Sequence, residues 1–279
     1  TQGDAGEYIH YGATTQDIMD TALALQVGAS ARYLAGIVTE LGDLLAGRVR
    51  EHADTIMAAR THGQQAVPTT FGAKLAVYLA QVADARERLL RSGRAASRVS
   101  LFGAGGTNAA MGPRSAAVRE RLAETLALGS AEVPWHVGRD RLGDVAHACG
   151  AAAAVCVRLA REVVDLSRSE IGEVAERAGH HRGASSTMPQ KVNPITAESI
   201  IGFGIAAQAE CAGLLRTIEA QHERSAGEWQ AEWLLIPQLV EHTASALALA
   251  RDLVATMTVD REAMSRNLEV DSGLLMSEA

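Results

Sequence analysis

The chain has 279 residues and a formal net charge of −7. Its basic residues do not form long runs, which argues against a nucleic-acid-binding surface. Three cysteines, Cys149, Cys156 and Cys211, lie in apolar sequence without metal-site spacing, so they are predicted to be small buried side chains in a reducing compartment rather than zinc ligands.

Helical periodicity dominates the chain. Apolar residues recur at intervals of three and four, and the alternation typical of strands is nearly absent. The Thr residues and Asp17 at the start of the first periodic stretch are expected to cap it. The spacing predicts five long helices, over residues 18–52, 70–94, 139–178, 194–222 and 235–257. We therefore expect an all-α protein, a bundle of long helices that completes its core by oligomerising.

The helix predicted over 139–178 contains the most apolar stretch of the chain. Arg158 and Arg161 interrupt this stretch, whereas a membrane span needs roughly 18 to 20 uninterrupted apolar residues. The first residues also lack the charged and then apolar pattern of a secretion signal. The sequence therefore predicts a cytoplasmic protein without a membrane partner.

A glycine-rich segment, LFGAGGTNAAMG, occupies residues 101–112. It follows no predicted strand and lacks the Lys-Ser/Thr ending of a nucleotide-binding loop. A tight linker between helices is the favoured interpretation.

The segment GASSTMPQKVNP, residues 183–194, cannot form an ordinary helix. Gly183 loosens the backbone, and Pro189 and Pro194 remove two amide donors and restrict the residues before them. Taken alone, Ser185 and Ser186 would be interpreted as turn or capping residues. However, the segment also holds a lysine and an asparagine, and loops on rigid scaffolds often carry the catalytic groups.

This loop resembles the signature of the fumarase/aspartase superfamily, in which a serine pair is followed by Met-Pro and by Lys-x-Asn-Pro. HYGATTQD (10–17) and RTHGQQAVPTTFG (60–72) resemble the family's other two active-site segments and occur in the same order. Three further segments, 134–142, 222–233 and 267–279, are similar to the branch that contains 3-carboxy-cis,cis-muconate cycloisomerase and, more distantly, adenylosuccinate lyase. The resemblance implies a helix bundle of the fumarase/aspartase type, completed by tetramerisation, with no metal or organic cofactor.

The resemblance also implies three catalytic roles. Ser185, which precedes Lys191 by six positions, would remove a proton from carbon, and the loop would have to stabilise its alkoxide. His62 would handle the proton of the leaving group, with the carboxylate of Glu198 orienting it. Bacterial carboxymuconate cycloisomerases commonly lack this histidine, so its presence favours elimination over lactone formation.

The other implied site residues would bind the substrate's carboxylates. Residues 14–16 precede a predicted helix start, where backbone N–H groups attract anions, while Asp17 is expected to cap the helix. Arg224 would add a guanidinium, although a surface ion pair with Glu223 or Glu228 is an equal alternative. The implied substrate-binding set is His10, Thr14, Thr15, Gln16, Thr61, Gln64, Ser186, Met188, Lys191, Asn193 and Arg224.

Together these features predict a C–N lyase that releases fumarate from a substituted succinate by anti β-elimination. A purine-linked amine, ammonia or nitrite are the candidate leaving groups, since the superfamily includes a nitrosuccinate lyase. One rival is the carboxymuconate cycloisomerase itself, and another is a superfamily member kept as a structural protein, which the intact site residues argue against. The expected partners are a small dicarboxylate substrate and other copies of the chain, in a homotetramer with shared active sites.

We expect residues 1–257 to form a central helical-bundle domain and residues 258–279 to begin a C-terminal helical domain. The chain starts with Thr1 and ends at Ala279 inside a helix-like pattern. Relatives in the family carry a segment before the first motif and a small helical domain after the last one. N- and C-terminal parts are therefore expected beyond this sequence.

Overall fold

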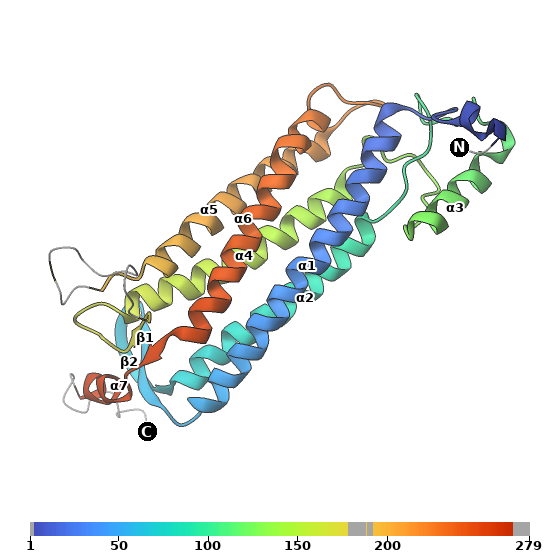
Figure 1. Cartoon of the computed structure of the whole chain (residues 1–279). Coiled ribbons are helices and arrows are strands. Elements are labelled where there is room, and N and C mark those ends of the chain that lie inside the picture. Colours follow the sequence, from blue (N-terminus) through green and yellow to red (C-terminus); the bar gives the residue numbers. More distant parts are fainter. Residues whose placement is uncertain (1–2, 178–187, 189–191, 270–279) are drawn as a thin grey trace. The chain divides into compact units, whose positions relative to one another are not determined.

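A computed structural model describes residues 3–177, 188 and 192–269. It forms two compact units, each built from three stretches of the chain. Each unit takes a segment of every one of the five long helices, which Figure 1 labels. The first unit comprises Thr1–Tyr33, Arg88–Cys149 and Ala209–Val240, and the second comprises Leu34–Glu87, Gly150–Gln208 and Glu241–Ala279. The domain boundary expected near residue 257 stays a prediction.

Helices make up most of the described chain, as the periodicity predicted. The long ones are α1 (Thr15–Glu51), α2 (Phe71–Ala96), α4 (Asp140–Leu166), α5 (Ile195–Leu215) and α6 (Glu228–Thr256). The short ones are α3 (Ser115–Leu126), α7 (Arg261–Leu268) and three 3-10 turns at Gly3–Tyr8, Gly112–Arg114 and Arg216–Glu219. The long-helix, all-α prediction is confirmed, and all five predicted helices are present.

Three helix boundaries differ clearly from the prediction. Helix α5 ends at Leu215 rather than near residue 222, and the 3-10 turn Arg216–Glu219 follows it. Helix α4 ends at Leu166 rather than near residue 178, because the chain turns at Gly172 (φ 61°) and the Glu173 amide donates to the Leu166 carbonyl. Helix α6 begins before the predicted residue 235 and includes Pro237. Its first turns are held by tertiary contacts, including a bond from Trp229 Nε1 to Asp20 at 3.3 Å, which the local pattern does not reveal.

Short strands were not predicted. β1 (Ile56–Thr61) and β2 (Gln64–Thr70) form an antiparallel hairpin, with a bulge between Ala58 and Arg60. β3 (Val174–Ala175) pairs with β4 (Thr258–Val259). Each strand is too short, or too irregular at the bulge, to show a sustained alternation of apolar and polar residues.

The core of the second unit is made of closely packed helix segments. A Cβ atom at Gly204 of α5 would collide with the Val157 side chain of α4 and lie 3.3 Å from the Ala153 carbonyl oxygen. Glycine at this position therefore lets α4 and α5 approach closely. The fully buried large side chains of this unit include Leu34, Leu41, Leu45, Leu75, Tyr78, Leu166 and Ile200.

The cysteines behave largely as predicted. Cys149 and Cys156 are buried, and Cys211 is half-buried. Burial raises the pKa of the Cys156 thiol to about 12, because the thiolate would lose its hydration. Cys156 is therefore a small apolar core residue rather than a reactive thiol.

Among the residues that the structure describes, two helices, α1 and α4, are long and apolar enough to cross a membrane by length and composition alone. Half of the most apolar window of α1, and 67% of that of α4, is buried inside the fold. Core helices of a folded domain pass the same test, so this is weak evidence for a membrane span.

Candidate active site

In the first unit, the start of α1 and the loop before α6 meet through Arg224. Arg224 Nε donates to Gln16 Oε1 at 3.0 Å, and its Nη2 donates to Thr14 Oγ1 and to the Ala104 carbonyl, both at 3.1 Å. The described residues contain no ion pair between Arg224 and Glu223 or Glu228. The structure thus brings together three of the predicted carboxylate-binding residues, Thr14, Gln16 and Arg224.

Gln16 helps to position the Arg224 side chain. Its side chain is buried, and its amide nitrogen donates to the His136 carbonyl at 2.9 Å while its oxygen accepts from Arg224. Both ends of the amide are therefore used within the protein, and Gln16 fixes the direction of the Arg224 guanidinium. Thr15 is exposed beside it, and His10 is exposed in a preceding turn, with a left-handed backbone (φ 63°).

Asp17, the residue after Gln16, is fully buried. One carboxylate oxygen accepts from the Thr14 and Gly103 amides at 3.0 and 2.8 Å. The other accepts from Ser100 Oγ and the Phe102 amide, both at 3.0 Å, and from His136 Nε2 at 2.7 Å. Since an ionised carboxylate only accepts, the Nε2 atom of His136 carries the proton in this contact.

The electrostatic balance at Asp17 favours the charged form. Burial alone would raise the pKa of this carboxyl, but the hydrogen bonds from His136 and from the Thr14, Gly103 and Phe102 amides lower it to about 2. The capping role predicted for Asp17 is confirmed by its bond from the Thr14 amide.

The contacts of Asp17 also explain the glycine-rich segment 101–112. The amides of Phe102 and Gly103 are turned to the carboxylate of Asp17 rather than to a phosphate, and Gly103 adopts φ 78°. This agrees with the interpretation of the segment as a tight linker.

A second buried charge cluster lies in the first unit. Arg139 Nη1 and Nη2 donate to Asp20 at 2.8 and 3.1 Å, and its Nε donates to Glu232 at 2.8 Å, with a further short bond from Nη2. All three side chains are almost fully buried. The cluster joins α1, α6 and the residue just before α4, and sequence analysis missed it because buried charges carry no local signal.

In the second unit, the predicted residues Thr61, His62 and Gln64 lie at the tip of the β1–β2 hairpin. Thr61 and Gln64 are paired, and the two residues between them have positive φ values, 53° for His62 and 77° for Gly63. Two central residues with positive φ are typical of a type I′ turn, the commonest two-residue hairpin connection. His62 is exposed, and the described residues provide no hydrogen-bond partner for its ring.

A buried ion pair fixes strand β1 next to this turn. Arg60, next to Thr61, donates from Nη1 and Nη2 to the two Glu173 oxygens at 2.9 and 2.7 Å. Asn267 Nδ2 donates to the same carboxylate at 2.7 Å, and Glu173 is fully buried. The hydrogen bonds that Arg60 donates to Glu173 raise the pKa of the Arg60 guanidinium, so the guanidinium stays charged. Sequence reasoning missed Glu173, which lies far from Arg60 along the chain.

The start of α5 is also fixed by a carboxylate. Glu176 accepts from the Thr196 and Ala197 amides at 3.1 and 2.7 Å, which satisfies donors that the first helical turn leaves free. Asn193 is half-buried just before the helix, Glu198 is exposed in its first turn, and Met188 is exposed. The predicted residues Ser185, Ser186 and Lys191 lie outside the described residues.

His62 and Glu198 are both in the second unit, but the structure contains no hydrogen bond or ion pair between them within one chain. The predicted pairing of these two residues is therefore not formed inside a single subunit.

The helical fold and the three motif segments define an all-α lyase architecture. A family model described as a lyase matches residues 2–209. The chain belongs to this lyase family, that of the fumarase/aspartase superfamily.

Individual relatives show which enzymes of the superfamily this chain is similar to. The chain is 41% identical to a 3-carboxy-cis,cis-muconate cycloisomerase of Bradyrhizobium diazoefficiens, over 99% of this chain and 61% of that protein. It is 33% identical to an N-acetyl-S-(2-succino)cysteine lyase of Enterococcus italicus, with the same coverage. The crystal structure of 3-carboxy-cis,cis-muconate lactonizing enzyme from Pseudomonas putida matches with a TM-score of 0.93 at 37% identity, over 99% of this chain and 61% of that one. The chain thus spans about three fifths of the length of these relatives.

Proposed function

We propose that the chain carries the catalytic part of a 3-carboxy-cis,cis-muconate cycloisomerase. In this reaction a carboxylate oxygen of the substrate adds across a carbon–carbon double bond, and a proton is added to a carbon beside another carboxylate. The product is a lactone that carries one proton more than the ionised substrate and is an isomer of the substrate's acid form. The observation that carries the proposal is the 41% identity to such an enzyme over 99% of the chain.

In this proposal some site residues bind the substrate's carboxylates and one residue transfers the proton. Arg224, held by Gln16 and Thr14, binds one substrate carboxylate through Nη1, because its Nε and Nη2 atoms already donate within the protein. Lys191 and Asn193 bind another. Ser185 delivers the proton to carbon, and in the reverse direction the same oxygen removes it as an alkoxide stabilised by nearby donors.

We further propose that the active protein is a homotetramer whose sites combine residues of different subunits, as the superfamily resemblance implies. In the assembly, Glu198 of one subunit would reach His62 of another and orient its ring.

Elimination from a substituted succinate, with release of fumarate, is the second candidate. It is supported by His62, placed at an exposed turn where it could protonate a leaving group, and by the 33% identity to a succinocysteine lyase. The two reactions are chemically close, because the reverse of lactone formation is the elimination of a carboxylate from the carbon next to an acidic C–H bond. Both therefore need a stabilised carbanion and bound carboxylates.

The experiment is to incubate the protein with 3-carboxy-cis,cis-muconate and, separately, with amino-, nitro-, purine- and cysteinyl-substituted succinates. Lactone formation is followed by loss of the diene absorbance, and fumarate is followed by chromatography. Lactone without fumarate supports the cycloisomerase. Fumarate from any succinate without lactone would replace it by the elimination, and neither product would reject both.

A further inference from the structure

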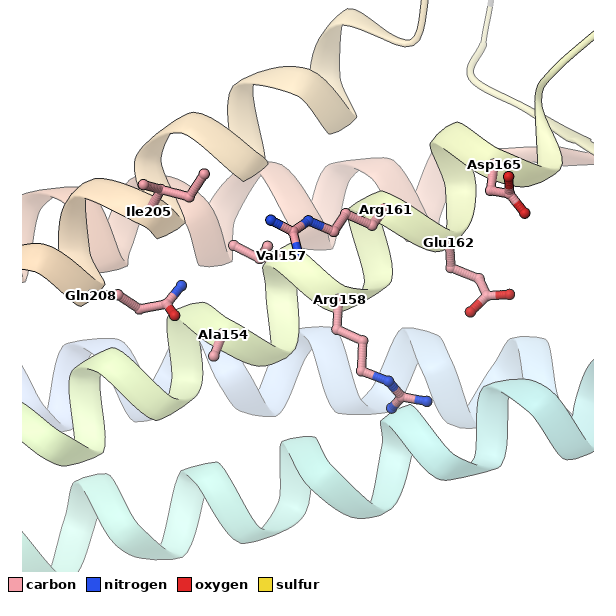
Figure 2. A pocket seen from close by; sticks show the side chains of 8 residues that line it. All are labelled: Ala154, Val157, Arg158, Arg161, Glu162, Asp165, Ile205 and Gln208. Carbon is pink, nitrogen blue, oxygen red and sulfur yellow. The ribbon is translucent and has the colours of Figure 1, made fainter. Parts of the chain in front are cut away.

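Polar side chains of α4 and of the segment before it have different surroundings in the two units. In the second unit, the exposed Arg158 and Arg161 of α4 line an open cavity of about 530 Å³ beside α5 (Figure 2). In the first unit, His136 and Arg139, which precede α4, are only 3% and 2% exposed. Buried polar groups are retained where they bond to specific partners, so the contacts of His136 indicate its role.

His136 contacts two neighbouring residues of the first motif segment. Its Nε2 atom donates to Asp17 Oδ1 at 2.7 Å, and its carbonyl accepts from Gln16 Nε2 at 2.9 Å. The Nδ1 atom of His136 is buried and has no hydrogen-bond partner among the residues that the structure describes. The contact with Asp17 is therefore the hydrogen bond that orients this imidazole.

These two contacts belong to a closed loop of hydrogen bonds, which we call the Arg224 network. From Gln16 the loop continues through Oε1 to Arg224 Nε at 3.0 Å, and from Asp17 it continues through Oδ2 to the Thr14 amide at 3.0 Å. Arg224 Nη2 donates to Thr14 Oγ1 at 3.1 Å and closes the loop. Two separate paths thus lead from the Arg224 guanidinium to one buried histidine.

A closed loop fixes the guanidinium more firmly than one contact would. Gln16 cannot change its rotamer without losing both Arg224 and the His136 carbonyl, because both ends of its amide are bonded. Burial raises the pKa of the Asp17 carboxyl, and the bond from His136 is the largest of the effects that lower it to about 2. The His136 ring thus helps to keep Asp17 ionised and able to accept from the Thr14 amide.

The chain on both sides of His136 is itself held in place. Trp135 Nε1 donates to the Val99 carbonyl at 3.2 Å, and Arg139 belongs to the buried charge cluster of this unit. The imidazole also meets the Phe102 ring edge to face, with 6.3 Å between the ring centroids. His136 therefore has a fixed position from which it can hold other residues.

We propose that His136 is a positioning residue of the carboxylate-binding site. It holds Gln16 through its carbonyl and Asp17 through its ring, and the Arg224 network then directs Arg224 so that Nη1 is left for the substrate. Since His136 is buried, it acts through these residues and does not touch the substrate. The inference rests on the proposed function, in which Arg224 binds a substrate carboxylate.

The kinetic test compares His136→Leu, which removes the side-chain donor, with His136→Gln, whose amide nitrogen can take the place of Nε2. In lactone formation from 3-carboxy-cis,cis-muconate, His136→Leu should raise KM at least about tenfold and change kcat by less than about threefold, because the lost contact serves binding. His136→Gln should bring KM back to within about threefold of wild type. If His136→Leu does not fold, His136→Asn takes its place, since its amide is too short to reach Asp17.

Three kinetic outcomes would overturn the proposal: a wild-type KM without the donor, a loss confined to kcat, or a His136→Gln variant no better than His136→Leu. Thr217→Val is the matched control. It removes an equally buried hydrogen bond of the same unit, from Thr217 Oγ1 to the Leu214 carbonyl at 2.8 Å, outside the Arg224 network. Its KM should equal that of wild type, and a similar rise in KM would mean that destabilisation alone explains the effect of His136→Leu.

Crystal structures of wild type, His136→Leu and His136→Gln test the inference without activity. Arg224 should keep its bonds to Gln16 and Thr14 in wild type and His136→Gln and should lose them in His136→Leu. If wild type forms no lactone, the proposed function fails, and these structures still decide the role of His136. An Arg224 side chain that keeps both bonds in His136→Leu would overturn the inference.

Discussion

The two units support their predicted site residues in different ways. In the first unit, the buried Asp17 bonds directly to the segment that holds Thr14, and Arg224 is fixed by side-chain hydrogen bonds. In the second unit, the buried Glu173 holds Arg60, and the exposed His62 in the neighbouring turn has no hydrogen-bond partner among the residues that the structure describes. The side chain of Arg224 is therefore ordered without a substrate. The His62 imidazole, in contrast, is exposed and can contact a substrate or another subunit.

The difference suggests a division between binding and chemistry. Charge recognition works best with groups that need no rearrangement, because ordering them on binding would reduce affinity. A proton-transfer group instead has to meet a substrate or another subunit, so an exposed turn on a rigid base suits it. The predictions below separate these two kinds of residue.

The largest effect is expected from Ser185→Ala. Without a proton-transfer group at the reacting carbon, turnover should fall by at least about 10⁴-fold, while helix content and assembly remain unchanged. Ser186→Ala is the matched control, because it alters the neighbouring hydroxyl only. Near-native turnover of the first variant together with loss in the second would show that the proton-transfer role belongs to Ser186.

Glu173→Ala should mainly affect stability. It leaves the Arg60 guanidinium without its buried partner, which typically lowers the free energy of unfolding by about 3 to 5 kcal/mol. Urea unfolding followed by circular dichroism measures the change. Glu170→Ala, an exposed acid nearby, should change stability by less than about 0.5 kcal/mol. An equally small change for Glu173→Ala would mean that the hairpin does not depend on this pair.

Asp17 predicts a defined acid dependence of stability. Its pKa is lowered from 3.8 to about 2 in the folded protein, so its stabilising effect is complete above the unfolded value and is lost as pH falls toward 2. The expected loss is about 2 kcal/mol. In Asp17→Asn the free energy of unfolding should change less with pH between these two values than in wild type. The control is Asp43→Asn, which removes an exposed carboxyl of α1 and should leave the pH dependence unchanged. Parallel pH profiles of wild type and Asp17→Asn would contradict the assignment.

The smallest effect on lactone formation is expected from His62→Asn. Asparagine also accepts the positive φ of a type I′ turn, so the hairpin should stay intact. A carboxylate oxygen needs no proton when its bond forms or breaks, so lactone formation should fall by less than about tenfold, short of the 10² to 10⁴ usual for a lost general acid. A loss of that larger size in fumarate release from amino-substituted succinates would instead support the elimination.

Some features could be predicted from the sequence because their physical causes are local. The helices follow from the spacing of apolar side chains along three to four residues, and the cap at Asp17 follows from its position at the first turn. The hairpin was missed, although its signal was present: His62-Gly63 stands between two short segments, as in two-residue turns that need positive φ.

What the tertiary structure alone decided is which charged groups meet. Asp17 and His136 are separated by 119 positions, and Arg60 and Glu173 by 113. In the sequence each is an ordinary polar residue, and nothing local shows that it will be buried. Burial removes water from these groups, so only a partner brought close by the fold can satisfy their hydrogen-bonding atoms. The sequence by itself determined the helices and the motif segments, while packing chose the buried pairs that hold those segments in place.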